Sequence, residues 1–215
     1  MRLNDEDIHI RKIFPTPVAS YWLADSDSLN RELKACILAR RDATPGVTHS
    51  NKGGWQSDGD FADWAGEAGR RLLDTARCLA SSLTAMHLDG SGLVHFEQDW
   101  QYNVWANINR QGDSNMLHGH PGAFWSGVYW VEDGGRAADP AVDGDLEFQD
   151  PRGMLPSVYR PELRMRIEEC LSAGYCTSEA ASSGRMLMFP SWLLHRVRPY
   201  LGQGERISVA FNFGV

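Results

Sequence analysis

Long apolar runs and paired cysteines are both missing from this chain of 215 residues. No run approaches the roughly 18 apolar residues that are needed to span a bilayer. The opening segment MRLNDEDIHIRKIFPTPV contains acids and lacks an apolar stretch, so it does not look like a secretory signal peptide. The cysteines are scattered without a CxxC spacing and are typical of reduced thiols: Cys36, Cys78, Cys170 and Cys176. These absences predict a soluble, cytoplasmic protein with no membrane partner.

Positive charge is also in short supply. The chain has 21 Lys and Arg against 28 Asp and Glu, for a formal net charge of −7. Phosphate backbones recruit basic surfaces, so nucleic acid is not an expected partner. A basic or neutral substrate, either a small molecule or a peptide, is easier to reconcile with an acidic surface. The hydrophobic content of 42% is ordinary for a globular protein, and the length suffices for one buried core.

The first part of the chain, about residues 1–92, is predicted to contain one strand and two helices. The segment IHIRKIFPTPVASYWL alternates and carries two prolines, which indicates a strand at a sheet edge. The spacing of apolar residues predicts a helix from about Ser28 to Arg41. A second helix is predicted from about Asp60 to Met86, and Gly66 can break it near its start.

The rest of the chain, about residues 93–215, changes to a period of two. Strand-like segments, each bounded by turn residues, are VHFEQDWQYNVWANINR, MLHGH, FWSGVYWV, GDLEFQD, GRMLMFPS, HRVRPYL and RISVAFNF. Short strands with turn signals between them indicate a sandwich or barrel. A segment with helical spacing, about 155–183, interrupts them and is expected to lie over one mouth of the barrel. The sequence therefore predicts a single domain, 1–215, that is mainly β with flanking helices (α+β) and has a jelly-roll core.

Three histidines are the strongest candidates for a metal site. His118 and His120 form an HxH pair in a strand-like segment, and alternate residues of a strand project to the same side. His195 follows an apolar run later in the chain. Three neutral nitrogen donors on a rigid sheet predict a mononuclear iron site.

A single arginine follows the last of these histidines. Arg206 opens the segment RISVAFNF, in which Ile207 and Val209 share one face while Arg206 and Ser208 share the other. An arginine inside a barrel is costly unless it is paired with an anion. Arg206 is therefore predicted to bind an anionic co-substrate, and Ser208 to line the same cavity.

The order of these segments resembles that of the iron(II)- and 2-oxoglutarate-dependent oxygenases. The resemblance covers roughly residues 100–215 and rests on WANINRQGDSNMLHGHPGAFWSGVYWV, GDLEFQDPR and MLMFPSWLLHRVRPYLGQGERISVAFNF. SNKGGWQS is also similar to a group of small, mostly bacterial members with unassigned substrates. The resemblance implies a double-stranded β-helix, which is a form of jelly roll.

The resemblance also implies roles for individual residues. His118 would be the first iron ligand, His195 the distal histidine, and Arg206 the partner of the far carboxylate of 2-oxoglutarate. Further candidate partners of this co-substrate lie on neighbouring strands: Tyr129, Asn107 or Asn109, and Ser208.

One position departs from the common family pattern of two histidines and a carboxylate. His120 stands where the Asp or Glu would fall. Asp113, Asp145 and Glu147 are alternative acids, but none has the expected spacing. We therefore predict three histidine ligands.

The substrate is expected near the barrel mouth. Aromatic residues that could form its walls are Trp100, Trp105, Phe124, Trp125 and Trp130. The loop SNKGGWQSDGD lacks the spacing of a phosphate-binding loop. It is expected to lie at the rim of the active site. The other histidines, among them His49, have no comparable context and are read as structural.

The sequence thus predicts an Fe(II)- and 2-oxoglutarate-dependent dioxygenase, a hydroxylase that uses dioxygen on an unidentified small molecule or peptide. One alternative is a cupin-like three-histidine iron dioxygenase without 2-oxoglutarate, and Arg206 favours the first reading. Another is a non-catalytic metal-binding jelly roll, which the lack of a fourth ligand disfavours. Strand edges near the N-terminus could support a homodimer.

Overall fold

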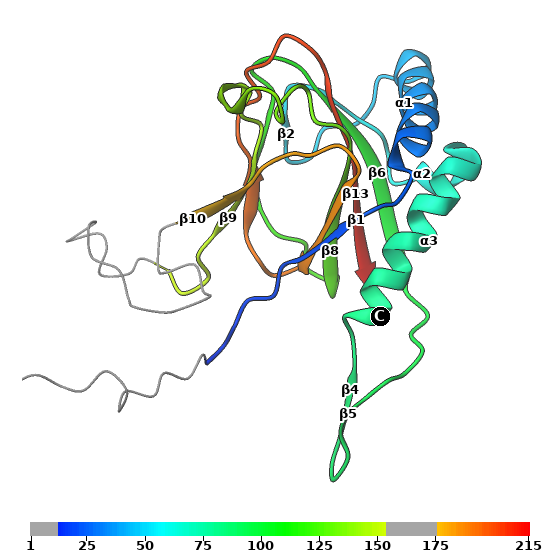
Figure 1. Ribbon diagram of the computed structural model, residues 1–215, viewed down its shortest axis with the longest axis vertical. Helices are drawn as coiled ribbons and strands as arrows, with labels where there is room; N and C mark the ends of the chain where they lie inside the picture. Colours follow the sequence, from blue (N-terminus) through cyan, green and yellow to red (C-terminus); the bar gives the residue numbers. More distant parts are fainter. Residues whose placement is uncertain (1–12, 154–175) are drawn as a thin grey trace, which may run out of the picture.

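The computed structural model describes residues 13–153 and 176–215, and two facing β-sheets form its centre (Figure 1). The strands of the larger sheet, in spatial order, are β1 (Ala19–Trp22), β11 (Arg185–Pro190), β8 (Trp125–Glu132), β13 (Arg206–Gly214), β6 (Gln101–Asn109) and β3 (Trp55–Gln56). Those of the smaller sheet are β10 (Cys176–Glu179), β9 (Leu146–Gln149), β12 (His195–Val197), β7 (Ser114–His118) and β2 (Asn51–Lys52). The pairings within both sheets are antiparallel.

Neighbouring strands of each sheet are far apart in sequence, as a jelly roll requires. In the larger sheet β13 lies between β6 and β8, and in the smaller sheet β12 lies between β7 and β9. The molecule is therefore mainly β with flanking helices, and its core is the double-stranded β-helix that the sequence predicted.

Helices cover the outer face of the larger sheet (Figure 1). They are α1 (Ser26–Ala43), α2 (Phe61–Trp64) and α3 (Gly66–Ser82). The prediction of α1 was right to within two residues at each end. The predicted second helix is two helices, because Gly66 adopts a φ of +62°, a left-handed conformation that favours glycine.

Alternation along the strands divides the buried residues into two layers. On β8, Tyr129 and Val131 pack with the helices, whereas Val128 and Trp130 pack between the two sheets. The layer between the sheets also contains Phe148, Leu187 and Phe189. Phe148 and Phe189 lie next to His195, so this layer borders the polar site described below.

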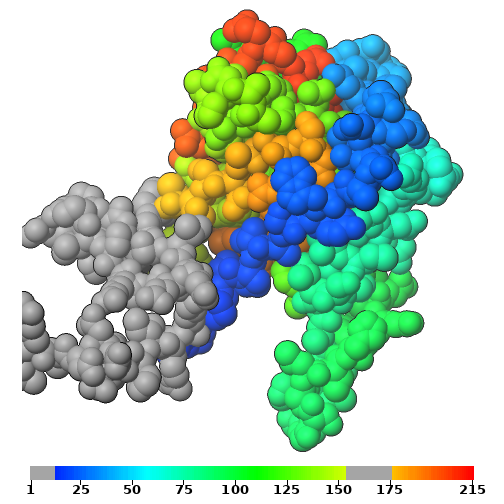
Figure 2. All heavy atoms as spheres, in the orientation of Figure 1, coloured from blue at the N-terminus to red at the C-terminus, as the bar shows by residue number. Residues whose placement is uncertain are grey.

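Several segments differ from their predictions. The predicted loop before α2 contains β2 and β3, which join the smaller and the larger sheet respectively. A hairpin of β4 (Met86–Leu88) and β5 (Gly92–Val94) projects from the body where the end of a helix was expected (Figures 1 and 2). It forms because Gly90 and Gly92, both at positive φ, permit a tight turn.

Two predictions fall partly outside the described residues. Of the predicted insertion at 155–183, residues 155–175 are not described, and Cys176–Glu179 form β10 where a helix was expected. Of the N-terminal strand, β1 is confirmed as an edge strand of the larger sheet, and residues 8–12 are not described. The homodimer stays a prediction. None of the helices in the described ranges has the length and apolar character needed to cross a bilayer.

Candidate metal and anion site

Three histidines converge at one end of the space between the sheets. His118 ends β7 and His195 begins β12, and the two residues are register partners. The ring centroids lie 4.5 Å apart for His118 and His195, 4.9 Å for His118 and His120, and 5.1 Å for His120 and His195. One nitrogen from each ring lies within 4.8 Å of the others. This cluster can hold a single metal ion.

His120 reaches the cluster in a way that the sequence reasoning did not foresee. It lies two residues beyond the end of β7, so strand alternation does not explain its direction. Its backbone N–H donates to the Ser191 carbonyl at 3.0 Å, which ties this turn to the segment after β11. At Gly119 a Cβ would lie 3.3 Å from Leu194 Cδ2 and 3.4 Å from Ser191 O, so glycine lets the turn pack closely.

Backbone carbonyls orient two of the rings. His118 Nδ1 donates to Met116 O at 2.7 Å, and His195 Nδ1 donates to Leu193 O at 2.8 Å. With Nδ1 acting as the donor, Nε2 of both rings is left as the free electron pair that a metal needs. Ser50 Oγ lies 3.5 Å from His118 Nε2.

Burial keeps all three imidazoles neutral. It lowers the pKa of His195 to about 3, and the backbone bond to Leu193 offsets part of this effect. Burial, followed by the nearby His118, lowers the pKa of His120 to about 4. The pKa of His118 is also lowered by burial. At neutral pH the cluster therefore offers three unprotonated nitrogens.

Arg206 lies in the same cavity as the histidines, and within residues 13–153 and 176–215 it forms no ion pair. Its side chain is 1% exposed, and Nη1 donates to Asn109 Oδ1 at 3.1 Å and to Ser208 Oγ at 3.5 Å. Nε is buried and has no hydrogen-bond partner among the residues that the structure describes. Burial lowers the pKa of Arg206 to about 10, which still leaves a cation at neutral pH. A buried cation in contact only with neutral groups is a site for an anion.

The three histidines and Arg206 line an inner cavity of about 60 Å³. Asn107 and Ser208 line it as well, and Asn109 contributes through its bond to Arg206. The two sheets supply opposite walls, since the histidines come from or follow β7 and β12 while Arg206 comes from β13. The structure thus brings His118, His120, His195, Arg206, Asn107, Asn109 and Ser208 together.

The prediction that Tyr129 contacts the co-substrate is wrong. Tyr129 lies on the face of β8 that packs against the helices, and its hydroxyl donates to Asn30 Oδ1 on α1 at 2.6 Å. Arg206 and the histidines lie on the opposite side of this sheet, so Tyr129 is not a partner for the co-substrate. Alternation correctly predicted that neighbouring residues of β8 point to opposite faces of the sheet. It does not show which of these faces lines the interior of the barrel.

The three acids considered as alternative metal ligands form other interactions. Asp145 forms an ion pair with Arg136 at 2.8 Å, and Glu147 forms one with Arg196 at 2.6 Å. Asp113 accepts the backbone N–H of Arg110 at 2.7 Å. None of the three belongs to the histidine cluster in the described part of the chain.

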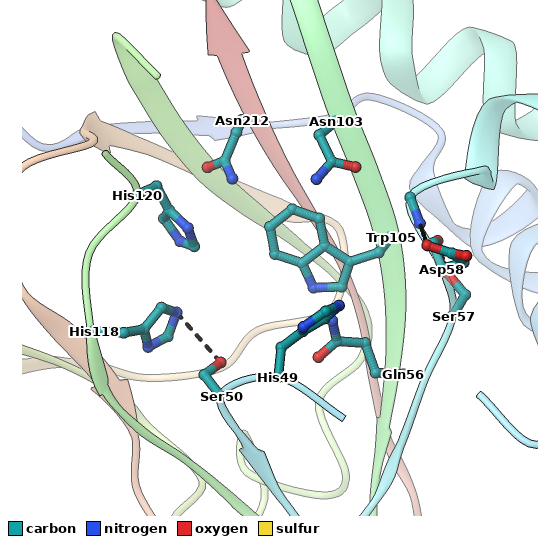
Figure 3. A pocket seen from close by; sticks show the side chains of 11 residues that line it. His49, Ser50, Gln56, Ser57, Asp58, Asn103, Trp105, His118, His120 and Asn212 are labelled. Carbon is teal, nitrogen blue, oxygen red and sulfur yellow. Dashed lines mark hydrogen bonds between the residues drawn. The ribbon is translucent and has the colours of Figure 1, made fainter. Parts of the chain in front are cut away.

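An outer cavity of about 320 Å³ adjoins His118 and His120 (Figure 3), and Arg206 does not line it. Of the aromatic residues expected as walls, only Trp105 lines it, whereas Trp100, Trp125 and Trp130 are buried in the packed layers. The loop predicted at the rim does lie there. Its residues in the lining are Ser50, Gln56, Ser57, Asp58 and Gly59.

The sequence reasoning missed His49 and Asn103 as lining residues of this outer cavity, whereas Asn212 belongs to the polar strand face that was expected to line a cavity. Asn103 and Asn212 lie opposite each other on β6 and β13. The alternation that placed Arg206 on the inner face of β13 also places Asn212 there. The same alternation along β6 places Asn103 on one face with Asn107 and Asn109, and it could have identified Asn103.

A double-stranded β-helix that brings neutral imidazoles and a buried guanidinium to one cavity defines a non-haem iron oxygenase with an anionic co-substrate. The family described as "Putative 2OG-Fe(II) oxygenase" matches residues 103–212, just over half of the chain. The chain belongs to this family of 2-oxoglutarate-dependent oxygenases. It uses Fe(II), 2-oxoglutarate and dioxygen, which removes the cupin-like and non-catalytic alternatives.

Solved structures support the fold. A prolyl-4-hydroxylase from Pseudomonas putida is 16% identical, with a TM-score of 0.58, and covers 93% of this chain and 92% of its own. HygX from Streptomyces hygroscopicus, solved with nickel and 2-oxoglutarate, is 13% identical, with a TM-score of 0.58 and coverages of 93% and 83%. A prolyl hydroxylase from Trichoplax adhaerens, in complex with a peptide, is 12% identical, with a TM-score of 0.60 and coverages of 92% and 83%. No curated protein matches the chain.

Proposed function

We propose that this oxygenase is a hydroxylase and that His118, His120 and His195 are its Fe(II) ligands. The observation that supports this most strongly is the convergence of three neutral imidazoles at the junction of two cavities, one of which ends at a buried arginine. A closed structural site would need a fourth protein ligand. In the described residues the cluster has three, which leaves metal positions for a co-substrate and dioxygen.

We further propose that Arg206 binds the C5 carboxylate of 2-oxoglutarate. Asn109 and Ser208 bind Nη1 of the guanidinium, so an N–H of Nε and one of Nη2 can together donate two hydrogen bonds to a carboxylate. The opposite end of 2-oxoglutarate then points toward the histidines across the inner cavity. Asn107 lines this cavity and is assigned as a further contact.

The residues of the chain position the ligands, supply the charge that binds the co-substrate and exclude water from the site. Bound Fe(II) and 2-oxoglutarate supply the oxidising chemistry, in which dioxygen converts 2-oxoglutarate to succinate and carbon dioxide and oxidises the substrate. The carbonyls of Met116 and Leu193 hold two of the ligand rings before metal arrives, which reduces the cost of ordering them. Phe189 packs against His195, with ring centroids 4.9 Å apart, and limits the access of water from that side.

The substrate is assigned to the outer cavity, because His118 and His120 line it while Arg206 does not. A C–H bond placed there lies on the open side of the proposed iron. The volume of about 320 Å³ suits a small molecule or one side chain of a peptide. Solved structures of both kinds exist for proteins of this fold, namely the peptide complex noted above and HygX with hygromycin B.

The experiment is a comparison of His120→Ala with His120→Asp. Anaerobic dialysis against Fe(II) should give one iron per wild-type chain and a clear loss in His120→Ala. His120→Asp should retain iron, because a carboxylate is the usual third ligand of such sites. Succinate release should follow the iron content. Full iron retention by His120→Ala would remove His120 from the ligand set.

A further inference from the structure

The outer cavity has different chemistry on two of its sides. Figure 3 shows His118 and His120 on one side, Asp58 on the other and the indole of Trp105 between them. The remaining walls are polar, and three of them are carboxamides: Gln56, Asn103 and Asn212. A substrate that fills this space touches the proposed iron at one end and a carboxylate at the other.

Asp58 carries the one acidic charge of the lining. Neither lysine nor arginine lines the cavity in the part of the chain that the structure describes. The Asp58 carboxylate accepts the backbone N–H of Gly59 at 2.8 Å, and within the same residues it forms no ion pair. Three neutral imidazoles add no negative charge that would compete with it. The cavity therefore favours a cation at the Asp58 end.

The position of Asp58 is fixed by the sheet. Ser57 pairs with Ala106 of β6, donating its N–H to Ala106 O at 2.9 Å and accepting the Ala106 N–H on Oγ at 3.0 Å. A Cβ on Gly59 would lie 2.2 Å from Asn103 Oδ1, so the glycine allows the backbone to lie directly on Asn103. These contacts hold the carboxylate at a set distance from the histidines, as a specificity-determining group requires.

Trp105 suits the middle of such a substrate. Its indole lies against His120, with ring centroids 5.9 Å apart, and lines both cavities. A flat aromatic face binds methylene groups, and it also attracts a cation that lies over it. An anionic substrate would meet the Asp58 carboxylate, and a fully apolar one would leave the three carboxamides without partners.

We propose that the substrate carries a protonated amine or guanidinium, which binds Asp58, and that its aliphatic part lies on Trp105 with a C–H bond facing His118 and His120. This inference rests on the proposed hydroxylase function and names its substrate class. Asp58 is then a specificity-determining residue. It binds the cation several bonds away from the reacting carbon and takes no part in the oxidation.

The test uses two pairs of uncharged-backbone probes that differ in the terminal group. Nα-acetyl-L-arginine methylamide is paired with its citrulline analogue, and Nα-acetyl-L-lysine methylamide with its norleucine analogue. Binding is measured by calorimetry under anaerobic conditions to protein loaded with Fe(II) and 2-oxoglutarate. At least one cationic probe should bind the wild type about tenfold more tightly than its neutral analogue, because a hydrogen bond to a charged group is lost in the analogue.

Variants locate the effect. Asp58→Asn should remove most of the discrimination, whereas Asp58→Glu should keep part of it. Asp63→Asn is the matched control, since Asp63 is an exposed acid on the adjacent α2 that does not line the cavity. If long-range charge caused the discrimination, both Asp→Asn variants would reduce it equally.

The outcomes separate this inference from the proposed function. Equal binding of cationic and neutral probes, discrimination that survives in Asp58→Asn, or no binding of either cationic probe would overturn the substrate class. In each case iron content and 2-oxoglutarate binding are measured on the same samples. If these too are absent, the proposed function fails; if they persist, only the substrate class does.

Discussion

The inner and outer cavities meet at the histidines and differ in almost every other respect. The inner cavity, about 60 Å³, ends at a fully buried cation, and the outer cavity, about 320 Å³, ends at an exposed carboxylate. Residues of strands form most of the inner walls, while a loop forms one side of the outer cavity. The inner end is built for one ligand of fixed size and charge, and the outer end for a separate ligand of opposite charge.

This contrast has a physical basis. Burial removes water from the Arg206 guanidinium, which costs free energy. An anion that binds Arg206 offsets this cost, so the inner cavity selects for an anion. At the wetter outer end each polar contact contributes less, so selectivity is shared among several side chains. One chain can thus hold a constant co-substrate tightly and a separate substrate more loosely.

Loss of a proposed metal ligand should have the largest effect. His195→Ala removes a proposed ligand, and Fe(II) affinity should fall by more than the roughly 10–100-fold that accompanies loss of a ligand's supporting hydrogen bond. Succinate release should disappear. The measurement is iron content after anaerobic dialysis. The matched control is His87→Ala, since His87 is exposed on the projecting hairpin; iron loss in both variants would contradict a role specific to His195.

The charge of the inner cavity is tested next. Arg206→Gln should keep iron but weaken 2-oxoglutarate binding by about 30-fold or more, because a buried charged hydrogen-bonding partner is lost. Without co-substrate this variant should unfold at the same temperature or higher, since a buried cation without a contacting counter-ion is removed. Arg71→Gln, an exposed change on α3, is the control. Unchanged 2-oxoglutarate affinity in Arg206→Gln would remove Arg206 from the binding site.

A third effect concerns the free energy of unfolding of the metal-free protein. Burial lowers the pKa of His195 to about 3 and that of His120 to about 4, below the unfolded value of about 6.5. As the pH falls below 6.5, the unfolded chain therefore takes up protons that the folded chain does not. The free energy of unfolding should be level above pH 6.5 and should fall by about 1.4 kcal/mol per pH unit for each such histidine.

Urea unfolding in the presence of EDTA between pH 7.5 and 5 measures this slope. His195→Ala should make the slope shallower, because one of the two histidines with a strongly lowered pKa is then lost. A wild-type slope of zero between pH 6.5 and 5 would show that the imidazoles are protonated in the folded protein. The cluster would then be unable to hold a metal without first losing protons.

The smallest expected effect is that of the residue that supports Arg206. Asn109→Ala removes the 3.1 Å bond from Arg206 Nη1 and leaves the charge in place. The Kd for 2-oxoglutarate should rise about fivefold, which corresponds to about 1 kcal/mol for a net hydrogen bond. The measurement is calorimetry on the anaerobic Fe(II) protein. A loss as large as that of Arg206→Gln would mean that Asn109 itself contacts the co-substrate.

The sequence identified more residues of the inner cavity than of the outer one. Alternation along RISVAFNF correctly separated Arg206 and Ser208 from Ile207 and Val209. Periodicity also predicted the jelly roll and α1. These features depend on regular strands and helices, whose side-chain directions repeat along the chain.

Features that depend on packing between distant segments could not be predicted from the sequence. The side of β8 on which Tyr129 lies depends on where the helices pack, and period two alone does not reveal it. The turn that directs His120 is fixed by Ser191, more than 70 positions away in sequence. The role of Asp58 depends on the pairing of Ser57 with β6, and a Gly-rich segment gives no periodic signal for such a pairing.

The central claim is that one iron and one 2-oxoglutarate share the cavity between the histidines and Arg206. Titration of 2-oxoglutarate into the anaerobic Fe(II) protein tests it directly, because chelation of iron by the co-substrate produces a weak charge-transfer absorption band in the visible. The account predicts that the band saturates at one equivalent in the wild type and needs about 30-fold more 2-oxoglutarate in Arg206→Gln. Fe(II) protein that shows no band, or a band with the same midpoint in both proteins, would contradict it.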